Sequence, residues 1–404
     1  MTSEIAIMNK RAIALATDSA VTIGKKDKIH NNTTKLFMLS QYHPVGIMVY
    51  GSSEFMGVPW EIVIREFGKE LRNRSYPTLR GYVKEFIKYL SDNSLDDNSY
   101  ERYYIKYYVN EFLKDFKSKV KENMNRITLN KYYELTKEEL NNIYKETINE
   151  YGIFQNNELD NLPLDHKQYI DKVYGIEISK IIDKVLDVSV ASSETLFNIK
   201  EMCILIFCKK DFSRKYSGIV IAGFGDKDIF PKLFSYEIEG KINSFVKYRE
   251  VENVEITYKY NFAIIPFAQS DVIQIFLRGI SSSYYNILND AFKKEIIEEI
   301  KNGSEYEASN QLIQYLNTKW TKITSIINNY SSEKYANPIL KLGPSLQIDE
   351  LAFMAESFVN LTSFRSQIAM DSDMLTVGGP TDVAVISKSD GFVWIKSKRY
   401  INFN

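Results

Sequence analysis

The sequence predicts an α/β protein of four layers, in which two antiparallel sheets pack on each other and helices cover their outer faces. Three observations favour this class. Short apolar runs separated by turns open the chain, a long stretch of amphipathic helical periodicity fills its middle, and paired strands return near its end. Hairpins and helices in this order are typical of sheets packed on each other with helices outside.

The first two predicted strands cover residues 4–8 and 11–16 and form a hairpin through the Asn-Lys pair between them. In an antiparallel hairpin the residue numbers of facing partners have a constant sum, which is about 19 or 20 for this turn. Thr2 is therefore expected across from Thr17 or Asp18. This pairing brings a carboxylate to the start of the chain.

The next predicted hairpin joins strands at residues 35–39 and 45–50 through a turn that contains proline. For this turn the sum of facing residue numbers is about 85. Lys35 is therefore expected across from Tyr50 or Gly51. A lysine then meets the backbone of a glycine at the end of its partner strand.

Helical periodicity governs most of the remaining chain, and strand character returns in short runs between the helices. Thr136 followed by Glu139 predicts a capping box at a helix start, and Gly240 is expected to supply a turn between strands. Helices are predicted at 58–90, 281–302, 304–329 and 348–370, and helical periodicity with polar breaks is found at 103–207. Strands are predicted at 218–223, 234–238, 262–266, 382–387 and 392–395.

These elements divide the chain into a sheet-containing core and two helical additions. The core is expected to be discontinuous, because its strands come from three separate parts of the sequence. We assign residues 1–90, 208–280 and 346–404 to the core, residues 91–207 to a helical insertion, and residues 281–345 to a helical extension.

The charge balance argues against nucleic acid and membranes as partners. The chain carries 51 basic and 52 acidic residues, a formal net charge of -1, so no long-range field attracts a polyanion. No segment reaches the ~18 uncharged apolar residues of a membrane span, and the N-terminus lacks the pattern of a signal peptide. A cytoplasmic location is expected.

Metal and cofactor sites are not expected either. Cys203 and Cys208 are the only cysteines, too few for a disulfide framework or a four-cysteine zinc site. The three histidines, His30, His43 and His166, lie far apart in the sequence, so neither a metal site nor a serine triad is favoured. We therefore predict chemistry that needs no cofactor.

If the two hairpins are neighbours, Thr2, Asp18, Lys35 and Gly51 meet at one edge of the sheet, and together they supply the groups of an acyl-transfer site. A free α-amino group with a pKa of ~8 can take the proton of a threonine hydroxyl on the same residue, which requires that Met1 is removed. The lysine stabilises the alkoxide, the carboxylate orients the lysine, and the glycine N–H can bind the oxyanion.

The sequence resembles the β subunits of proteasomes and their bacterial relatives. The resemblance lies in TSEIAIMNKRAIALATDSAVTIG, then NNTTKLF, then GIMVYGSSE. In that family a first threonine is followed by an aspartate, a lysine and a glycine that ends a strand, and Thr2, Asp18, Lys35 and Gly51 match those positions. The resemblance implies the N-terminal-nucleophile (Ntn) hydrolase fold, with the helical regions as insertions.

Two later segments extend the resemblance to about half of the chain. SGIVIAGFGDKDIFPKLFSYEIEGKI is similar to a strand pair of the family, and the stretch from LQIDELAF to DGFVWI is similar to its late helix and closing strands. Within DMLTVGG, Asp373 and Thr376 match the family's Asp-x-x-Ser pair before two glycines. The resemblance implies that this pair supports the amine and hydroxyl of the nucleophile.

The resemblance also implies a substrate-binding set. Val21, Thr33, Val49 and Ser53 match positions that line the pocket for the side chain before the cleaved bond, and the backbone of Thr22 matches a position that pairs with the substrate. These residues are mostly small or apolar. They indicate a pocket for an uncharged side chain.

The function predicted from these features is a threonine-dependent amide-bond hydrolase, a peptidase similar to the proteasome subunits, with a peptide or protein as substrate. The alternative is a catalytically inactive scaffold or binding protein of the same fold, with its helical insertions as partner surfaces. Assembly into a homo-oligomer is left open.

Overall fold

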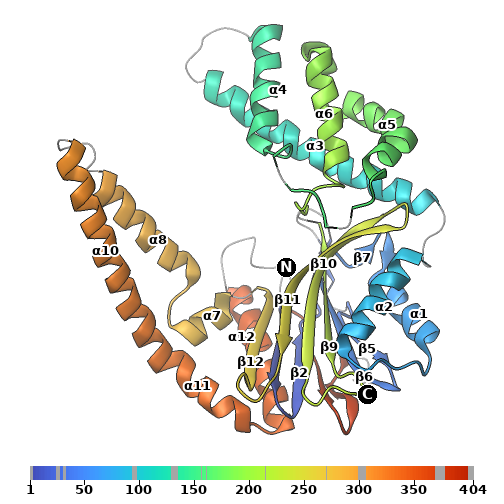
Figure 1. The fold of residues 1–404 in the computed structure, drawn as a ribbon, viewed down its shortest axis with the longest axis vertical. Helices are drawn as coiled ribbons and strands as arrows, with labels where there is room; N and C mark the ends of the chain where they lie inside the picture. Colours follow the sequence, from blue (N-terminus) through green and yellow to red (C-terminus); the bar gives the residue numbers. More distant parts are fainter. Residues whose placement is uncertain are drawn as a thin grey trace.

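Two five-stranded antiparallel sheets form the centre of the molecule (Figure 1). This computed structural model describes residues 3–23, 28–30, 33–92, 98–128, 135–155, 157–160, 162–213, 215–269, 271–298, 306–368 and 378–398. The strand order is β12-β1-β2-β13-β14 in the first sheet and β11-β10-β9-β6-β5 in the second. The mixed α and β class with antiparallel sheets is confirmed.

The strands of both sheets come from the beginning, middle and end of the chain. The first sheet contains β1 (Ser3–Asn9), β2 (Ala12–Thr17), β12 (Phe262–Ala268), β13 (Asp382–Ser387) and β14 (Gly391–Lys396). The second contains β5 (Leu36–Ser40), β6 (His43–Gly51), β9 (Ser217–Gly223), β10 (Lys232–Ile242) and β11 (Phe245–Glu255). Two small hairpins lie outside them: β3 (Val21–Ile23) with β4 (Lys28–His30), and β7 (Glu54–Phe55) with β8 (Val58–Pro59).

The two sheets pack face to face through the side chains of alternate residues. Ala6 and Met8 of β1 belong to the same buried cluster as Met48 of β6 and Val220 of β9. Their neighbours in sequence point to the opposite face, because successive side chains of a strand alternate. Burial on both faces explains why β1, β2, β9 and β13 read as continuous apolar runs rather than as alternating patterns.

Helices cover the outer face of each sheet. On the first sheet, α12 (Ile348–Ile368) and α7 (Asp271–Arg278) pack on a cluster that includes Ile5 and Ile7 of β1. On the second sheet, α1 (Trp60–Leu71) packs on β5, and α2 (Leu79–Asp92) packs on β9, β10 and β11. The described layers therefore run helix, sheet, sheet, helix.

The predicted helical insertion packs on the same side as α1 and α2. Its helices are α3 (Asn98–Thr128), α4 (Lys137–Tyr151), α5 (His166–Val185) and α6 (Ser193–Leu205), with the short η1 (Val188–Val190) between the last two. The capping box at α4 is confirmed: the Glu139 amide donates to Thr136 Oγ1 at 3.2 Å and the Thr136 amide donates to Glu139 Oε2 at 2.9 Å.

The predicted helical extension forms an arm that projects from the first sheet (Figure 1). Its elements are α8 (Ser282–Phe292), η2 (Lys293–Glu298), α10 (Tyr306–Ser331), η3 (Ser332–Ala336), α11 (Asn337–Leu342) and η4 (Gly343–Ser345). Large apolar side chains along α10 are exposed, among them Ile323, Ile326 and Tyr330. The arm therefore contributes little to the core of the sheets.

The register of the first hairpin differs by one or two residues from the prediction. Glu4 pairs with Thr17, so the loop consists of Lys10 and Arg11 rather than Asn9 and Lys10. The reason is the Asn9 side chain, whose Oδ1 accepts from the Arg11 amide at 2.9 Å and so moves the turn along the chain.

The second hairpin is also shifted by one residue. Leu36 pairs with Met48, and the Val49 amide donates to the Lys35 carbonyl at 2.9 Å, so Lys35 lies across from Val49 rather than Tyr50 or Gly51. A bulge lies between Met38 and Ser40, where β6 has one more residue than β5.

Two further predictions need correction, and one strand was not predicted. The helical stretch at 58–90 is two helices, because Pro77 lies in the break between α1 and α2. Gly240 lies within β10 and not in a turn; an added Cβ would lie 2.6 Å from the Tyr104 ring, so this glycine lets that ring pack. Strand β11 was not predicted because most of its outer residues are charged and exposed.

Candidate active site

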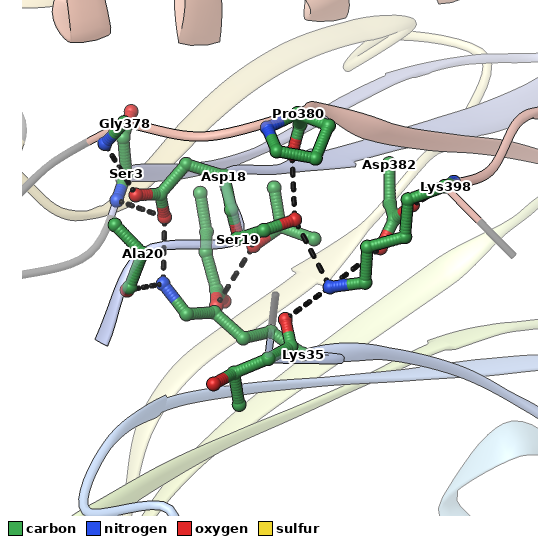
Figure 2. A network of polar contacts seen from close by, with 12 residues as sticks. Ser3, Asp18, Ser19, Ala20, Lys35, Gly378, Pro380, Asp382 and Lys398 are labelled. Carbon is green, nitrogen blue, oxygen red and sulfur yellow. Dashed lines mark hydrogen bonds and ion pairs between the residues drawn. The ribbon is translucent and has the colours of Figure 1, made fainter. Parts of the chain in front are cut away.

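A buried carboxylate organises the start of the chain. Asp18 follows β2 and is 0% exposed. Its Oδ1 accepts from the Ser3 amide at 3.1 Å and from the Lys35 ammonium at 2.7 Å, and its Oδ2 accepts from the Gly378 amide at 3.1 Å (Figure 2). Three segments that are far apart in the sequence therefore meet at one side chain.

The Lys35 ammonium is held between the two sheets. Lys35 precedes β5 of the second sheet, but its Nζ donates to Asp18 Oδ1 of the first sheet and to the Ala20 carbonyl at 2.6 Å. The side chains of the pair are 5% and 0% exposed. Because both charges are buried and each has hydrogen-bond partners, the ammonium is fixed in place.

A second lysine fixes the loop around the site. Lys398 donates from Nζ to Ser19 Oγ at 3.0 Å and to the Thr33 carbonyl, and pairs with Asp382 at 3.6 Å (Figure 2). Ser19 also donates to the Pro380 carbonyl at 2.6 Å. These contacts hold the segment that carries Asp18 against the segment that leads to Lys35. No sequence motif indicated Lys398, because its role depends on contacts between distant segments.

Glu4 is a titratable group of the site that the sequence analysis missed. It is 0% exposed, and it lies on the same face of β1 as Ala6 and Met8, between the two sheets. Its Oε1 accepts from Thr17 Oγ1 at 3.3 Å, while its Oε2 has no hydrogen-bond partner among the described residues. The only signal in the sequence was a charged residue in an apolar strand.

The charge state of Glu4 depends on its buried surroundings. Burial raises the pKa of its carboxyl from an ordinary 4.5 to about 8; the ammonium of Lys35 opposes this rise and the carboxylate of Asp18 adds to it. At neutral pH Glu4 is therefore mostly a neutral acid. It can donate a hydrogen bond beside the charged pair without adding a second negative charge.

Gly51 presents a backbone N–H at the end of β6. The Val49 amide donates toward β5 and the Ser52 amide donates to the Tyr216 carbonyl on the other side, at 3.0 Å. Amides of alternate residues point the same way along a strand. The Gly51 N–H therefore points toward the β5 side, beyond Lys35, whose carbonyl accepts from Val49.

Only glycine fits at position 51. Its φ is +76°, a left-handed conformation, and an added Cβ would lie 2.5 Å from the Tyr216 carbonyl oxygen. The turn that follows this residue therefore depends on glycine, and it directs the chain away from the sheet and into the β7–β8 hairpin.

A pocket of about 160 Å³ opens beside Lys35 and Gly51. Three predicted substrate-binding residues, Thr33, Val49 and Ser53, line it. The pocket is closed by the β7–β8 hairpin and the first turn of α1. The remaining lining residues are Thr34, Phe37, Ser52, Glu54, Pro59, Trp60 and Glu61. The two glutamates differ from the expected small and apolar lining.

The structure places two of the other predicted residues. Val21 and Thr22 lie on β3, where they pair with His30 and Ile29. Thr2, Asp373 and Thr376 lie outside the described residues.

No metal-binding group emerges from the described part of the chain: no three His, Cys, Asp or Glu side chains there lie close enough together to hold an ion. None of the helices in that part has a stretch long and apolar enough to span a bilayer. A scan against protein-family models gave no match, and a search of curated proteins found no significant relative.

Proposed function

We propose that the protein is an amide-bond hydrolase, a peptidase with the fold of the Ntn hydrolases, in which Thr2 is the nucleophile after removal of Met1. The observation that carries the proposal is the buried Asp18–Lys35 pair, which also binds the Ser3 amide. Consecutive Cα atoms are ~3.8 Å apart, so the first residue of the processed chain is one residue away from this pair.

Each group near the pair has a role in acyl transfer. The α-amine of Thr2 takes the hydroxyl proton, and the resulting alkoxide attacks the carbonyl carbon of the substrate. The Lys35 ammonium stabilises the alkoxide, and Asp18 keeps that ammonium in position. The Gly51 N–H donates to the oxyanion of the tetrahedral intermediate. The amine then gives its proton to the leaving nitrogen, and water releases the acyl group by the same steps.

The arrangement of layers supports the assignment of the fold. Antiparallel sheets packed face to face, with helices outside and the site at one end between the sheets, are the features that the resemblance implies. The pocket beside Gly51 provides a place for the side chain before the cleaved bond. Asp373 and Thr376 are proposed, by the resemblance alone, to support the amine.

Two measurements test the proposal. The intact mass of the purified protein should equal that of a chain beginning at Thr2, since a retained Met1 removes the amine that acts as base. A peptide epoxyketone or vinyl sulfone should then label the native protein. Thr2→Ala should abolish labelling, and Thr2→Ser should retain part of it.

The same experiment decides against the alternative of an inactive scaffold. A scaffold would keep its fold and remain unlabelled by every electrophile, whatever residue occupies position 2. Circular dichroism of Thr2→Ala should match that of the native protein, so that lost labelling reflects lost chemistry.

A further inference from the structure

The pocket beside Lys35 and Gly51 has the size of a single side chain. Its volume of about 160 Å³ is below the ~300 Å³ of the smallest pockets that enclose whole small molecules. Its inner wall is apolar: Phe37 comes from β5, Val49 from β6, and Trp60 from the start of α1, and all three are buried. This wall suits the hydrocarbon part of a side chain.

The rim of the pocket is acidic. Glu54 of the β7–β8 hairpin and Glu61 of α1 both line it. Between Lys35 and Arg65 the chain contains no lysine or arginine, and these two glutamates are its only acidic residues there. The pocket is therefore framed by a segment whose charge is negative.

The positive charges at either end of that segment have partners. The Lys35 ammonium is bound by Asp18 and the Ala20 carbonyl. Arg65 pairs with Glu61 at 2.7 Å, one helical turn away. Glu61 also lies in the first turn of α1, where a carboxylate stabilises the positive end of the helix dipole. The charge of Glu61 is thus largely balanced within the protein.

Glu54 is the other acidic residue that lines the pocket. Its side chain is exposed at the rim of the pocket, and it forms no ion pair with any residue in the described ranges. Its backbone carbonyl accepts from Ser52 Oγ at 3.1 Å and from Ser217 Oγ at 3.3 Å, which fixes the hairpin that carries it. A carboxylate that has no ion pair among the described residues, on a fixed backbone above an apolar pocket, fits a cation on an aliphatic stem.

We propose that this pocket takes a lysine or arginine side chain immediately before the cleaved bond, and that Glu54 selects it. This inference rests on the proposed function, since it assigns the substrate class of the same site. It replaces the uncharged side chain expected from Val21, Thr33, Val49 and Ser53, because that set includes neither of the two glutamates that line the pocket.

The test uses three peptide epoxyketones that differ only in the residue next to the electrophile, which is arginine, leucine or glutamate. Labelling of the native protein should be fastest with arginine and slowest with glutamate. Glu54→Gln should lower the ratio of the arginine rate to the leucine rate by roughly 1.4-fold to fivefold, the range for an exposed ion pair. Glu54→Lys should lower it further and favour the glutamate probe.

The matched control is Glu66→Gln. Glu66 lies on α1, pairs with Lys69 at 2.6 Å, and does not line the pocket, so this variant should keep the native ratio. In native protein the ratio should also fall as the salt concentration rises from about 0.05 M to 0.5 M, because salt screens exposed charges.

The outcomes separate the two proposals. Labelling of Thr2 that is fastest with leucine, with a ratio that Glu54→Gln leaves unchanged, would overturn the selection of basic side chains and leave the hydrolase intact. Absence of labelling by all three probes would overturn the hydrolase, and the selection with it.

Discussion

Glu4 is a neutral acid in the folded protein and an ordinary carboxylate in the unfolded chain. Its pKa is about 8 in the fold against an ordinary 4.5, so between these values the folded state holds a proton that the unfolded state has lost. The contribution of Glu4 to the free energy of unfolding is therefore fully present below pH 4.5. Its effect on stability falls by up to about 1.4 kcal/mol per pH unit as the pH rises toward 8.

We predict that Glu4→Gln removes this dependence. Glutamine keeps the shape and the hydrogen bond from Thr17 but cannot ionise. Urea unfolding at several pH values from 5 to 9 should show the native protein losing stability relative to the variant as the pH rises. Parallel curves for the two proteins would show that Glu4 is ionised in the fold at neutral pH.

Gly51→Ala should impair both stability and chemistry. The left-handed conformation costs alanine about 1–3 kcal/mol, and the contact with the Tyr216 carbonyl adds to that. Gly391→Ala is the matched control, because its φ is +71° but nothing lies within 4 Å of an added Cβ. Both variants should lose stability in thermal unfolding, and only Gly51→Ala should lose labelling. Equal labelling rates would remove Gly51 from the site.

Asp18→Asn should destabilise the fold by about 3–5 kcal/mol, because it leaves the buried Lys35 ammonium without its counter-charge. The control is Lys247→Met, which breaks a similarly buried pair with Glu239, at 2.8 Å and with side chains 4% and 2% exposed. Both variants should unfold at a lower urea concentration than the native protein. At a temperature where both variants are folded, only Asp18→Asn should abolish labelling. Full labelling of Asp18→Asn would exclude the pair from the chemistry.

At the scale of elements, one side chain determines how the first hairpin aligns. Asn9 accepts from the Arg11 and Ala12 amides through Oδ1, at 2.9 and 3.3 Å, and its Nδ2 donates to the Gly343 and Leu346 carbonyls, at 3.3 and 2.9 Å. It therefore connects the β1–β2 turn to the segment before α12. In the resulting register, the backbone of Ser3 lies beside Asp18.

Asn9→Ala should cost about 2–4 kcal/mol, since it leaves several buried backbone groups without partners, each worth about 1 kcal/mol. Thr136→Ala, which removes only the cap of α4, should cost about 1 kcal/mol. Urea unfolding of both variants measures the difference. Equal losses would mean that water replaces the contacts of Asn9.

The sequence predicted most strands but not their registers. Apolar runs bounded by turn residues located β1, β2, β5, β6, β9 and β13 to within two residues. The pairing of Glu4 with Thr17 depends on the Asn9 side chain, and that of Leu36 with Met48 on a bulge. Neither is visible in a hydrophobic pattern. Charged outer faces concealed β11, because an edge strand exposes one face to solvent.

At the scale of the molecule, the site is assembled from segments near both ends of the chain. The resemblance to proteasome β subunits identified Asp18, Lys35 and Gly51, and the structure brings these three together. The resemblance gave no reason to expect that Glu4 or Lys398 belongs to the site. Their roles follow from tertiary contacts. Burial raises the pKa of Glu4, and Lys398 donates to Ser19, a residue far from it in the sequence.

The central claim is that the residue before Ser3 performs nucleophilic attack beside a fixed ammonium. The most direct test is to label the protein with a peptide epoxyketone, digest it, and locate the modification by tandem mass spectrometry. The account predicts one modified site, on an N-terminal peptide that begins at Thr2 with both its amine and its hydroxyl bound to the probe. A probe attached to any other residue, or an unmodified N-terminal peptide that still carries Met1, would contradict it.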